Sequence, residues 1–152
     1  PYLYFPDDLR SDPPIDLAAL EEAAAAEIAQ FEGVAFAVSS SAMRSGKVPE
    51  GEAGLLIANN FNPDRSGDVM IVFEPYFFIN DFDGLTVAST HGSPWEYDTH
   101  VPMVFAGYGL PQGRVERKLH TVDIAPAAAA LAGIDPPAGA VGTVPAELIR
   151  DK

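Results

Sequence analysis

The residues best able to do chemistry are concentrated in one stretch, residues 90–102, which reads THGSPWEYDTHVP. It contains His91 and His100, two of the chain's three histidines, together with the carboxylates of Glu96 and Asp98. In a chain without cysteine, imidazole and carboxylate groups are the side chains left to bind zinc. The stretch therefore predicts a catalytic site, one part of a larger metal site, or a polar loop between apolar strands.

His100 is the residue of this stretch best suited to bind a metal. If the chain is extended around it, Asp98 lies two residues earlier and projects to the same side. The Asp98 carboxylate then either binds the same metal or accepts the other imidazole N–H. His91 precedes Gly92, whose missing side chain permits close approach of another group. A zinc site needs three or four protein ligands, so the stretch predicts only part of a site.

The other motif candidates favour ordinary structural roles. Ser93 lies near His91 without the pattern of a hydrolase nucleophile, and the chain has no thiol. Residues 39–49 are serine-rich but lack the glycine pattern of a phosphate-binding loop. Residues 80–84 (NDFDG) resemble a piece of a calcium loop, but a hairpin turn is the ordinary explanation for Asp and Gly there. His120 precedes a helix start, which predicts a surface or hinge role.

Helices and buried strands must hold the 90–102 stretch in place. Apolar residues at three- and four-residue spacing predict a helix over residues 16–31. Continuous apolar runs predict buried strands at 34–38 and 68–73. Two more apolar runs predict strands on either side of the stretch, at residues 85–89 and 101–106. This alternation of helix and buried strand is typical of a layered α/β or α+β domain.

Capping residues mark where the helices begin and end. Asp16 is the expected N-cap of the first helix. The expected apolar stripe of this helix is Leu17, Leu20, Ala24, Ile28 and Phe31, and the opposite face carries Glu21, Glu22 and Ala25. Thr121 or Asp123 is expected to cap a later helix through Leu131, with a glycine closing it.

The composition of the whole chain sets limits on function. It has 152 residues, a formal net charge of −13 and no cysteine. The length suits one compact domain with a real core. The negative charge argues against nucleic-acid binding, and an anionic substrate would require bound cations. Because the chain lacks an initial Met and a signal-peptide pattern, we expect it to be a fragment. No apolar run in the sequence is long enough to span a bilayer.

Four blocks, in order along the chain, resemble the alkaline phosphatase superfamily. The resemblance is to bacterial zinc-dependent enzymes with a threonine nucleophile and to type I phosphodiesterase-nucleotide pyrophosphatase relatives. The blocks are NNFNPDRSGDVMIVFEP, THGSPWEYDTHVP, VPMVFAGYGL and TVDIAPAAAALAGI. The last block resembles the family's T-D-I-A-P-T helix, with Val122 inserted and Ala127 in place of the final Thr. The gapped resemblance covers most of residues 16–143.

The resemblance implies a fold and a site. The fold is α/β: the C-terminal part of a three-layer α/β/α architecture, with a mixed sheet and flanking helices. His100, in the D-T-H-V-P motif, corresponds to a zinc ligand of a two-zinc site, and His91 and Asp98 correspond to residues that line the site or support its ligands. The remaining ligands and the threonine nucleophile belong upstream, so no catalytic nucleophile is expected within these residues.

The resemblance also implies partners and location. The substrate is a small phosphoester, the remainder of the catalytic domain is the protein partner, and neither nucleic acid nor a membrane span is involved. The family implies a periplasmic or secreted protein. The motif of residues 65–68 also matches the family, and it is either functional or a buried turn held by an Arg–Asp pair.

We therefore expect residues 1–152 to form a single-domain fragment, with an extended opening segment over 1–15 and a loop-rich tail over 135–152. The expected function is that of the C-terminal part of a zinc-dependent phosphoester hydrolase, inactive alone, with phosphomonoesters favoured over diesters. One alternative is an alkaline-phosphatase-like binding or interaction domain without activity. Another is a calcium-binding surface module around Asp81 and Asp83.

Overall fold

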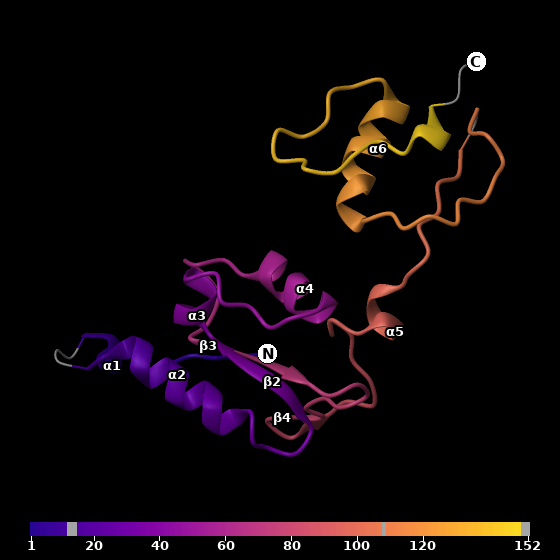
Figure 1. The fold of residues 1–152 in the computed structure, drawn as a ribbon. Helices are drawn as coiled ribbons and strands as arrows, with labels where there is room; N and C mark the ends of the chain where they lie inside the picture. The colour runs from indigo at the N-terminus through magenta and orange to yellow at the C-terminus, as the bar shows by residue number, and fades with distance from the viewer. Residues whose placement is uncertain (12–14, 108, 150–152) are drawn as a thin grey trace. The chain divides into compact units, whose positions relative to one another are not determined.

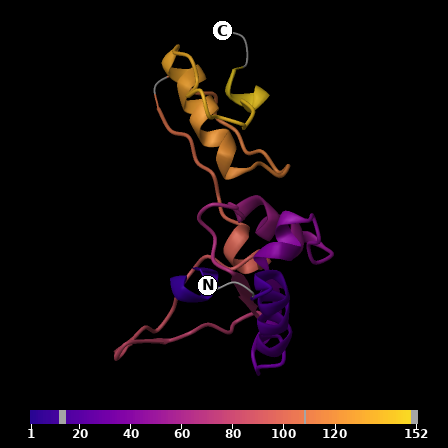
Figure 2. The same cartoon turned by 90° about the vertical axis from the view of Figure 1, so that its left-hand side faces the viewer.

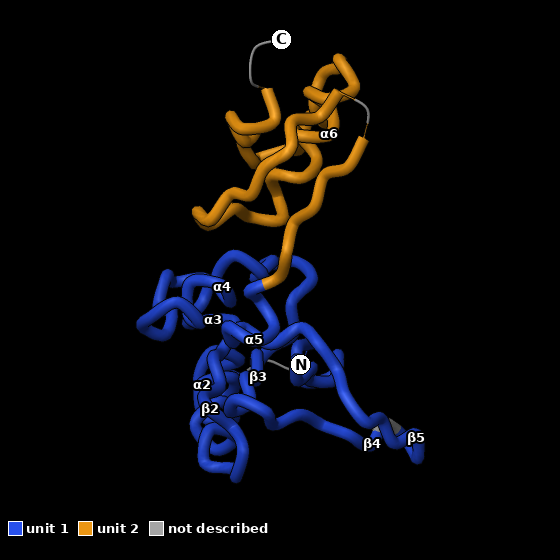
Figure 3. Tube along the Cα trace, turned by 90° about the vertical axis from the view of Figure 1, so that its right-hand side faces the viewer, with its two compact units in different colours: residues 1–100 blue, residues 101–152 orange. Residues whose placement is uncertain are grey.

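The structure is a computed structural model that describes residues 1–11, 15–107 and 109–149. It divides into two compact units, residues 1–100 and 101–152, which Figure 3 draws in different colours. Among the described residues, no helix combines the length and apolar character needed to cross a membrane.

A three-stranded antiparallel sheet forms the centre of the first unit (Figure 1). Strand β3 (Val69–Phe73) lies between β1 (Tyr2–Leu3) and β2 (Val34–Ser39). β2 and β3 correspond to the two runs, 34–38 and 68–73, that the sequence predicted as buried strands. Both predictions are confirmed, because each run is long and apolar enough to pair and to bury one face.

The register between β2 and β3 places Val38 opposite Met70 and Ser39 opposite Val69. The pairing is irregular between Val34 and Phe36, where one extra residue is accommodated. Val69 has no exposed surface, so the middle strand is the best-covered part of the sheet.

Helices flank this sheet. The helices described in the first unit are α1 (Asp7–Ser11), α2 (Leu17–Ile28), α3 (Ser40–Arg44), α4 (Glu52–Asn60) and α5 (Glu96–Thr99). As predicted, Asp16 caps α2: its carboxylate accepts the Ala19 N–H at 3.1 Å. After α2 the chain turns at Gly33, whose φ of 81° suits glycine, and enters β2.

One face of α2 differs from the prediction. Glu21 and Ala25, expected opposite the apolar stripe, are buried, whereas Phe31 is 63% exposed. The Glu21 carboxylate accepts hydrogen bonds from the N–H and the hydroxyl of Ser41, at the start of α3. The position of Glu21 was mispredicted because these hydrogen bonds from Ser41, a distant residue in the sequence, offset the cost of burying the carboxylate. The serine-rich segment thus contains the helix α3, and the N–H groups of Ser41 and Ala42 in its first turn have acceptors within the chain.

The hydrophobic core of the first unit joins four elements. Val38 of β2, Met43 of α3, Ile57 of α4 and Val72 of β3 form one buried cluster. Trp95, which lies just before α5, packs against this cluster. The core therefore reaches the stretch that contains the candidate site.

The opening segment, residues 1–15, is more structured than the expected extended chain. It contains β1 and the short helix α1. Arg10 of α1 donates to both oxygens of the buried Asp68 carboxylate at 2.8 and 2.7 Å. The Phe5 N–H donates to the same carboxylate at 2.6 Å. The segment is thus fixed to the sheet by a carboxylate 58 residues away from Arg10.

The segments beside the candidate site correct two predictions. Of residues 85–89 only β5 (Leu85–Thr86) is a strand, and it pairs with β4 (Asp81–Phe82) in a hairpin that projects away from the main sheet (Figures 2 and 3). Residues 101–106 are not a strand, and Val104 is 81% exposed. An apolar run becomes a buried strand only when a neighbouring strand pairs with its backbone, and none of the described strands does so here.

The second unit is built around one helix. The elements described there are η1 (Thr121–Asp123), α6 (Ile124–Ala132) and η2 (Ala146–Leu148). The predicted later helix is confirmed, and Gly133, with φ 69°, closes it. The described part of the tail, residues 135–149, is loop-rich apart from η2.

Candidate functional site

The 90–102 stretch begins as a loop and then forms the single helical turn α5. The turn is closed by hydrogen bonds from Thr99 N–H to the Trp95 carbonyl at 3.0 Å and from His100 N–H to the Glu96 carbonyl at 2.8 Å. The expectation that Asp98 and His100 share one side of an extended chain was therefore wrong. Two positions apart on a helical turn, their side chains point in different directions.

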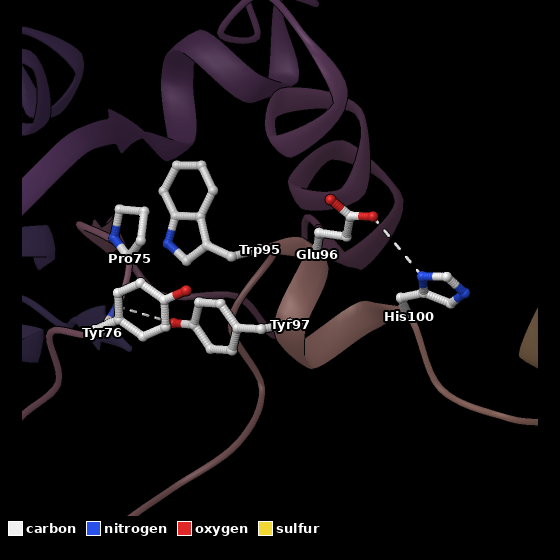
Figure 4. A pocket seen from close by; sticks show the side chains of 6 residues that line it. All are labelled: Pro75, Tyr76, Trp95, Glu96, Tyr97 and His100. Atoms are coloured by element: carbon white, nitrogen blue, oxygen red, sulfur yellow. Dashed lines mark hydrogen bonds and ion pairs between the residues drawn. The ribbon is translucent and has the colours of Figure 1, made fainter.

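Two aromatic side chains attach this turn to the end of β3. The Trp95 indole N–H donates to the Phe73 carbonyl at 2.9 Å. The Tyr97 hydroxyl accepts the Tyr76 N–H at 3.1 Å, and the two tyrosine rings stack with centroids 4.7 Å apart and planes 16° apart (Figure 4). The turn thus has connections to both the core and the loop after β3.

Asp98 holds the loop that precedes the turn. Its carboxylate accepts the Ser93 N–H at 2.6 Å. This hydrogen bond is the main reason why the pKa of Asp98 lies below its ordinary value, and the Gly92 N–H acts in the same direction. The Asp98 carboxylate is therefore committed to the backbone of this loop.

His100 presents its imidazole to solvent. Its side chain is 82% exposed, and Nδ1 lies 3.7 Å from Glu96 Oε1. Both side chains line an open pocket with Trp95 and the two stacked tyrosines (Figure 4). Glu96 was not among the predicted site residues, although its i, i+4 spacing to His100 in a helical turn was a usable signal.

These groups fit one part of a metal site. An accessible neutral imidazole is a good zinc ligand, and that of His100 is unobstructed. Among the described residues, no group of three or more His, Asp or Glu side chains is arranged to hold a metal ion. His100 therefore suits a site whose other ligands come from elsewhere.

The third histidine, His120, belongs to a hydrogen-bonded cluster at the start of α6. His120 donates its backbone N–H to the Asp123 carboxylate at 2.9 Å, and Thr143 donates its N–H at 2.8 Å. Asp123 is buried, and these two N–H groups, Thr143 first, hold its pKa below the ordinary value. Asp123 thereby ties the start of α6 to the tail, which gives this cluster a structural role.

The two acidic motifs also have local explanations. In the hairpin, Asp81 Oδ1 accepts the Gly84 N–H at 2.9 Å, as expected of a turn. In the 65–68 motif, the expected pairing of Asp68 with the arginine of the motif was wrong: the Asp68 carboxylate pairs with Arg10 of α1 instead. The sequence could not identify this partner because the pairing depends on where α1 packs.

Several known proteins are similar to this chain in sequence. No protein-family model matches the chain. It is 37% identical over 121 residues to a protein named calcium-transporting ATPase from Myroides odoratus, covering 80% of this chain and 22% of that protein. It is 30% identical over 146 residues to alkaline phosphatase PhoV from Synechococcus elongatus, covering 96% of this chain and 26% of the relative.

A solved structure matches almost the whole chain. The crystal structure of wild-type alkaline phosphatase PafA matches with a TM-score of 0.81 and 28% identity, over 98% of this chain and 28% of that one. The chain thus spans about a quarter of the length of the relatives it matches.

Proposed function

Because the chain belongs to the alkaline phosphatase superfamily, we propose that it is the C-terminal part of a zinc-dependent phosphoester hydrolase in which His100 is one metal ligand. The family membership agrees with the predicted fold class, a fragment of an alkaline-phosphatase-like α/β fold with flanking helices. The proposal follows the alkaline phosphatase relatives because they match 96% and 98% of this chain, against 80% for the protein named as an ATPase.

The observation that carries the proposal is the position of His100. It ends a turn that aromatic contacts hold to the core, and its ring is exposed within the D-T-H-V-P motif. Two zinc ions, when bound, would offset the charge of a phosphoester and lower the pKa of an attacking hydroxyl. The chain itself carries a net charge of −13, so an anionic substrate requires such cations.

The roles of the neighbouring residues follow from their contacts. Asp98 orders the loop from Gly92 to Ser93, and His91 lies near that carboxylate. Both residues line or support the site without being ligands in this proposal. The favoured substrate is a small phosphomonoester, with a diester as the alternative, and the expected location is periplasmic or secreted.

Large apolar side chains exposed on the surface favour a protein partner that covers them. Large apolar side chains such as Val104 and Val141 are more than four-fifths exposed, at 81% and 82%. Exposed apolar surface commonly marks an interface. We propose that the remainder of the catalytic domain is this partner and that it supplies the nucleophile and the missing ligands.

Replacing His100 in the full-length protein tests the proposal. His100→Ala should lower zinc content and reduce kcat/KM for a phosphomonoester by more than about 100-fold, because even partners of ligands change activity by 10–100-fold. His120→Asn is the matched control, since Asn can also cap a helix. The measurements are metal analysis and steady-state kinetics.

Two outcomes of this test would contradict the proposal. If His100→Ala keeps the wild-type zinc content, His100 is not a ligand. If the unaltered protein binds no zinc and hydrolyses no phosphoester, the alternative of an inactive binding or interaction domain is correct.

A further inference from the structure

We propose that Trp95 and Tyr97 are positioning residues that fix His100 by attaching α5 to the end of β3 and to the loop that follows it. The functional part of this inference depends on the proposed role of His100 as a metal ligand. The structural part, that two aromatic contacts order the turn, stands on the contacts alone.

The turn needs external support because it is short. α5 contains four residues, and isolated helical segments of this length are not stable in water. Trp95, at its N-cap position, makes no side-chain capping bond. His100 has an exposed ring, so packing of its own side chain does not hold it in place. The position of the imidazole therefore depends on how firmly the backbone of α5 is held.

Trp95 supplies the first contact. Its ring packs against the buried cluster that includes Val38 and Val72, and its N–H donates to the Phe73 carbonyl at the end of β3. A partly buried indole of this kind contributes both apolar area and one directional bond. This contact fixes the start of the turn.

Tyr97 supplies the second contact, on the loop that follows β3. Its hydroxyl accepts the Tyr76 N–H, and its ring stacks on the Tyr76 ring. Tyr76 has a φ of 69°, a conformation that is unfavourable for a residue with a side chain. Such strain persists only where surrounding contacts impose it. The hydrogen bond and the stack therefore form a specific connection between α5 and this loop.

Metal ligation makes this connection important for function. A ligand must be held within about 0.5 Å of its working position, and supporting contacts provide that precision. Tyr97 lies three residues before His100, on the same turn. Loosening Tyr97 should therefore displace His100 without removing any ligand atom.

The structural part is tested in the full-length protein by amide hydrogen exchange at His100, whose N–H donates to the Glu96 carbonyl. Tyr97→Phe removes the hydroxyl but keeps the stack, and it should accelerate exchange at His100 on the order of threefold to tenfold. Tyr97→Leu removes both contacts and should have a larger effect. Exchange in β3 should not change, because Tyr97 is half-exposed and outside the core.

Two further variants make the test specific. Tyr76→Gly keeps the N–H donor and removes the stacked ring, so it separates the two contributions of the tyrosine pair. Tyr4→Phe removes a tyrosine hydroxyl elsewhere in the same unit and should leave exchange at His100 unchanged. Unchanged exchange at His100 in both Tyr97 variants would overturn the inference.

The functional part is tested with Zn²⁺ in the full-length protein. Tyr97→Phe should weaken zinc binding by about threefold to tenfold, and added Zn²⁺ should restore kcat. A tyrosine that only stabilised the fold would show no rescue by zinc. If His100→Ala loses zinc while both Tyr97 variants bind it normally, the inference fails and the proposed function stands. If His100→Ala keeps its zinc, the proposed function fails, whatever the exchange data show.

Discussion

Asp98 and Asp123 show how single carboxylates organise this chain. Each accepts backbone N–H groups from residues that lie before it or far after it in the sequence, and each has a lowered pKa as a result. Asp98 orders the loop before α5. Asp123 connects His120 with Thr143, 20 residues further along the chain.

The lowered pKa of Asp123 predicts a dependence of stability on pH. In the unfolded chain this carboxyl binds a proton near its ordinary pKa of 3.8, whereas in the folded chain it does so only at lower pH. Its contribution to stability is therefore complete above the unfolded pKa and is lost as pH falls through the folded pKa. Asp123→Asn should reduce this loss as the pH falls below the ordinary pKa of 3.8.

The measurement is the free energy of opening of α6, from amide exchange at several pH values. Asp135→Asn changes an exposed aspartate of the same unit and should leave the acid dependence as it is. An unchanged acid dependence in Asp123→Asn would show that the two N–H bonds are not maintained in solution.

At the scale of elements, short helices depend on close contacts with neighbouring segments. α4 contains Gly54, and a Cβ at this position would overlap the backbone carbonyl oxygen of Pro49. The loop before α4 therefore lies directly against the helix. The same reasoning applies to α5, where aromatic side chains rather than backbone atoms make the contact.

Gly54→Ala should destabilise the first unit. In an open helix this change would stabilise by about 1 kcal/mol, because alanine is the better helix former. Here the added methyl group displaces the Pro49 backbone, and overpacking of this kind costs about 1–3 kcal/mol. Because the overpacking cost exceeds the gain in helix propensity, the free energy of unfolding in urea should decrease.

Gly113→Ala is the control for this prediction. No heavy atom other than those of its chain neighbours lies within 4 Å of a Cβ at Gly113, so the free energy of unfolding should change by less than about 0.5 kcal/mol. Equal or increased stability of Gly54→Ala would mean that Pro49 moves away without cost.

At the scale of the whole molecule, the proposed function assigns the described residues to one part of a reaction centre. The first unit has the larger core and carries His100 at its end. The second unit connects α6 to the tail through Asp123. Whether the two units unfold together, as expected of a single domain, is measurable by calorimetry of the 152-residue chain.

The isolated chain should not hydrolyse p-nitrophenyl phosphate. One histidine ligand does not complete a zinc site, and the proposed nucleophile lies outside these residues. The expected result is a rate equal to the buffer background with Zn²⁺ present, whereas the full-length protein turns over. Turnover by the isolated chain that disappears in His100→Ala would show that the site is complete within these residues.

Several features were predictable from sequence because they depend on neighbouring residues. The apolar runs of β2 and β3, the Asp16 cap and the Gly133 closure are local patterns, and the structure confirms each of them. The ordered blocks around D-T-H-V-P indicated the superfamily, since side-chain identity alone carries that signal.

The tertiary structure decided what depends on distant partners. Arg10 pairs with Asp68 across 58 residues, and Glu21 is buried because Ser41 meets it. The turn at Asp98 is helical rather than extended, since Trp95 and Tyr97 attach it to the end of β3. Residue types and their local order thus show which side chains can do chemistry, whereas packing selects the direction in which each side chain points. The physical reason is that a side chain's direction follows from backbone conformation, which long-range contacts select.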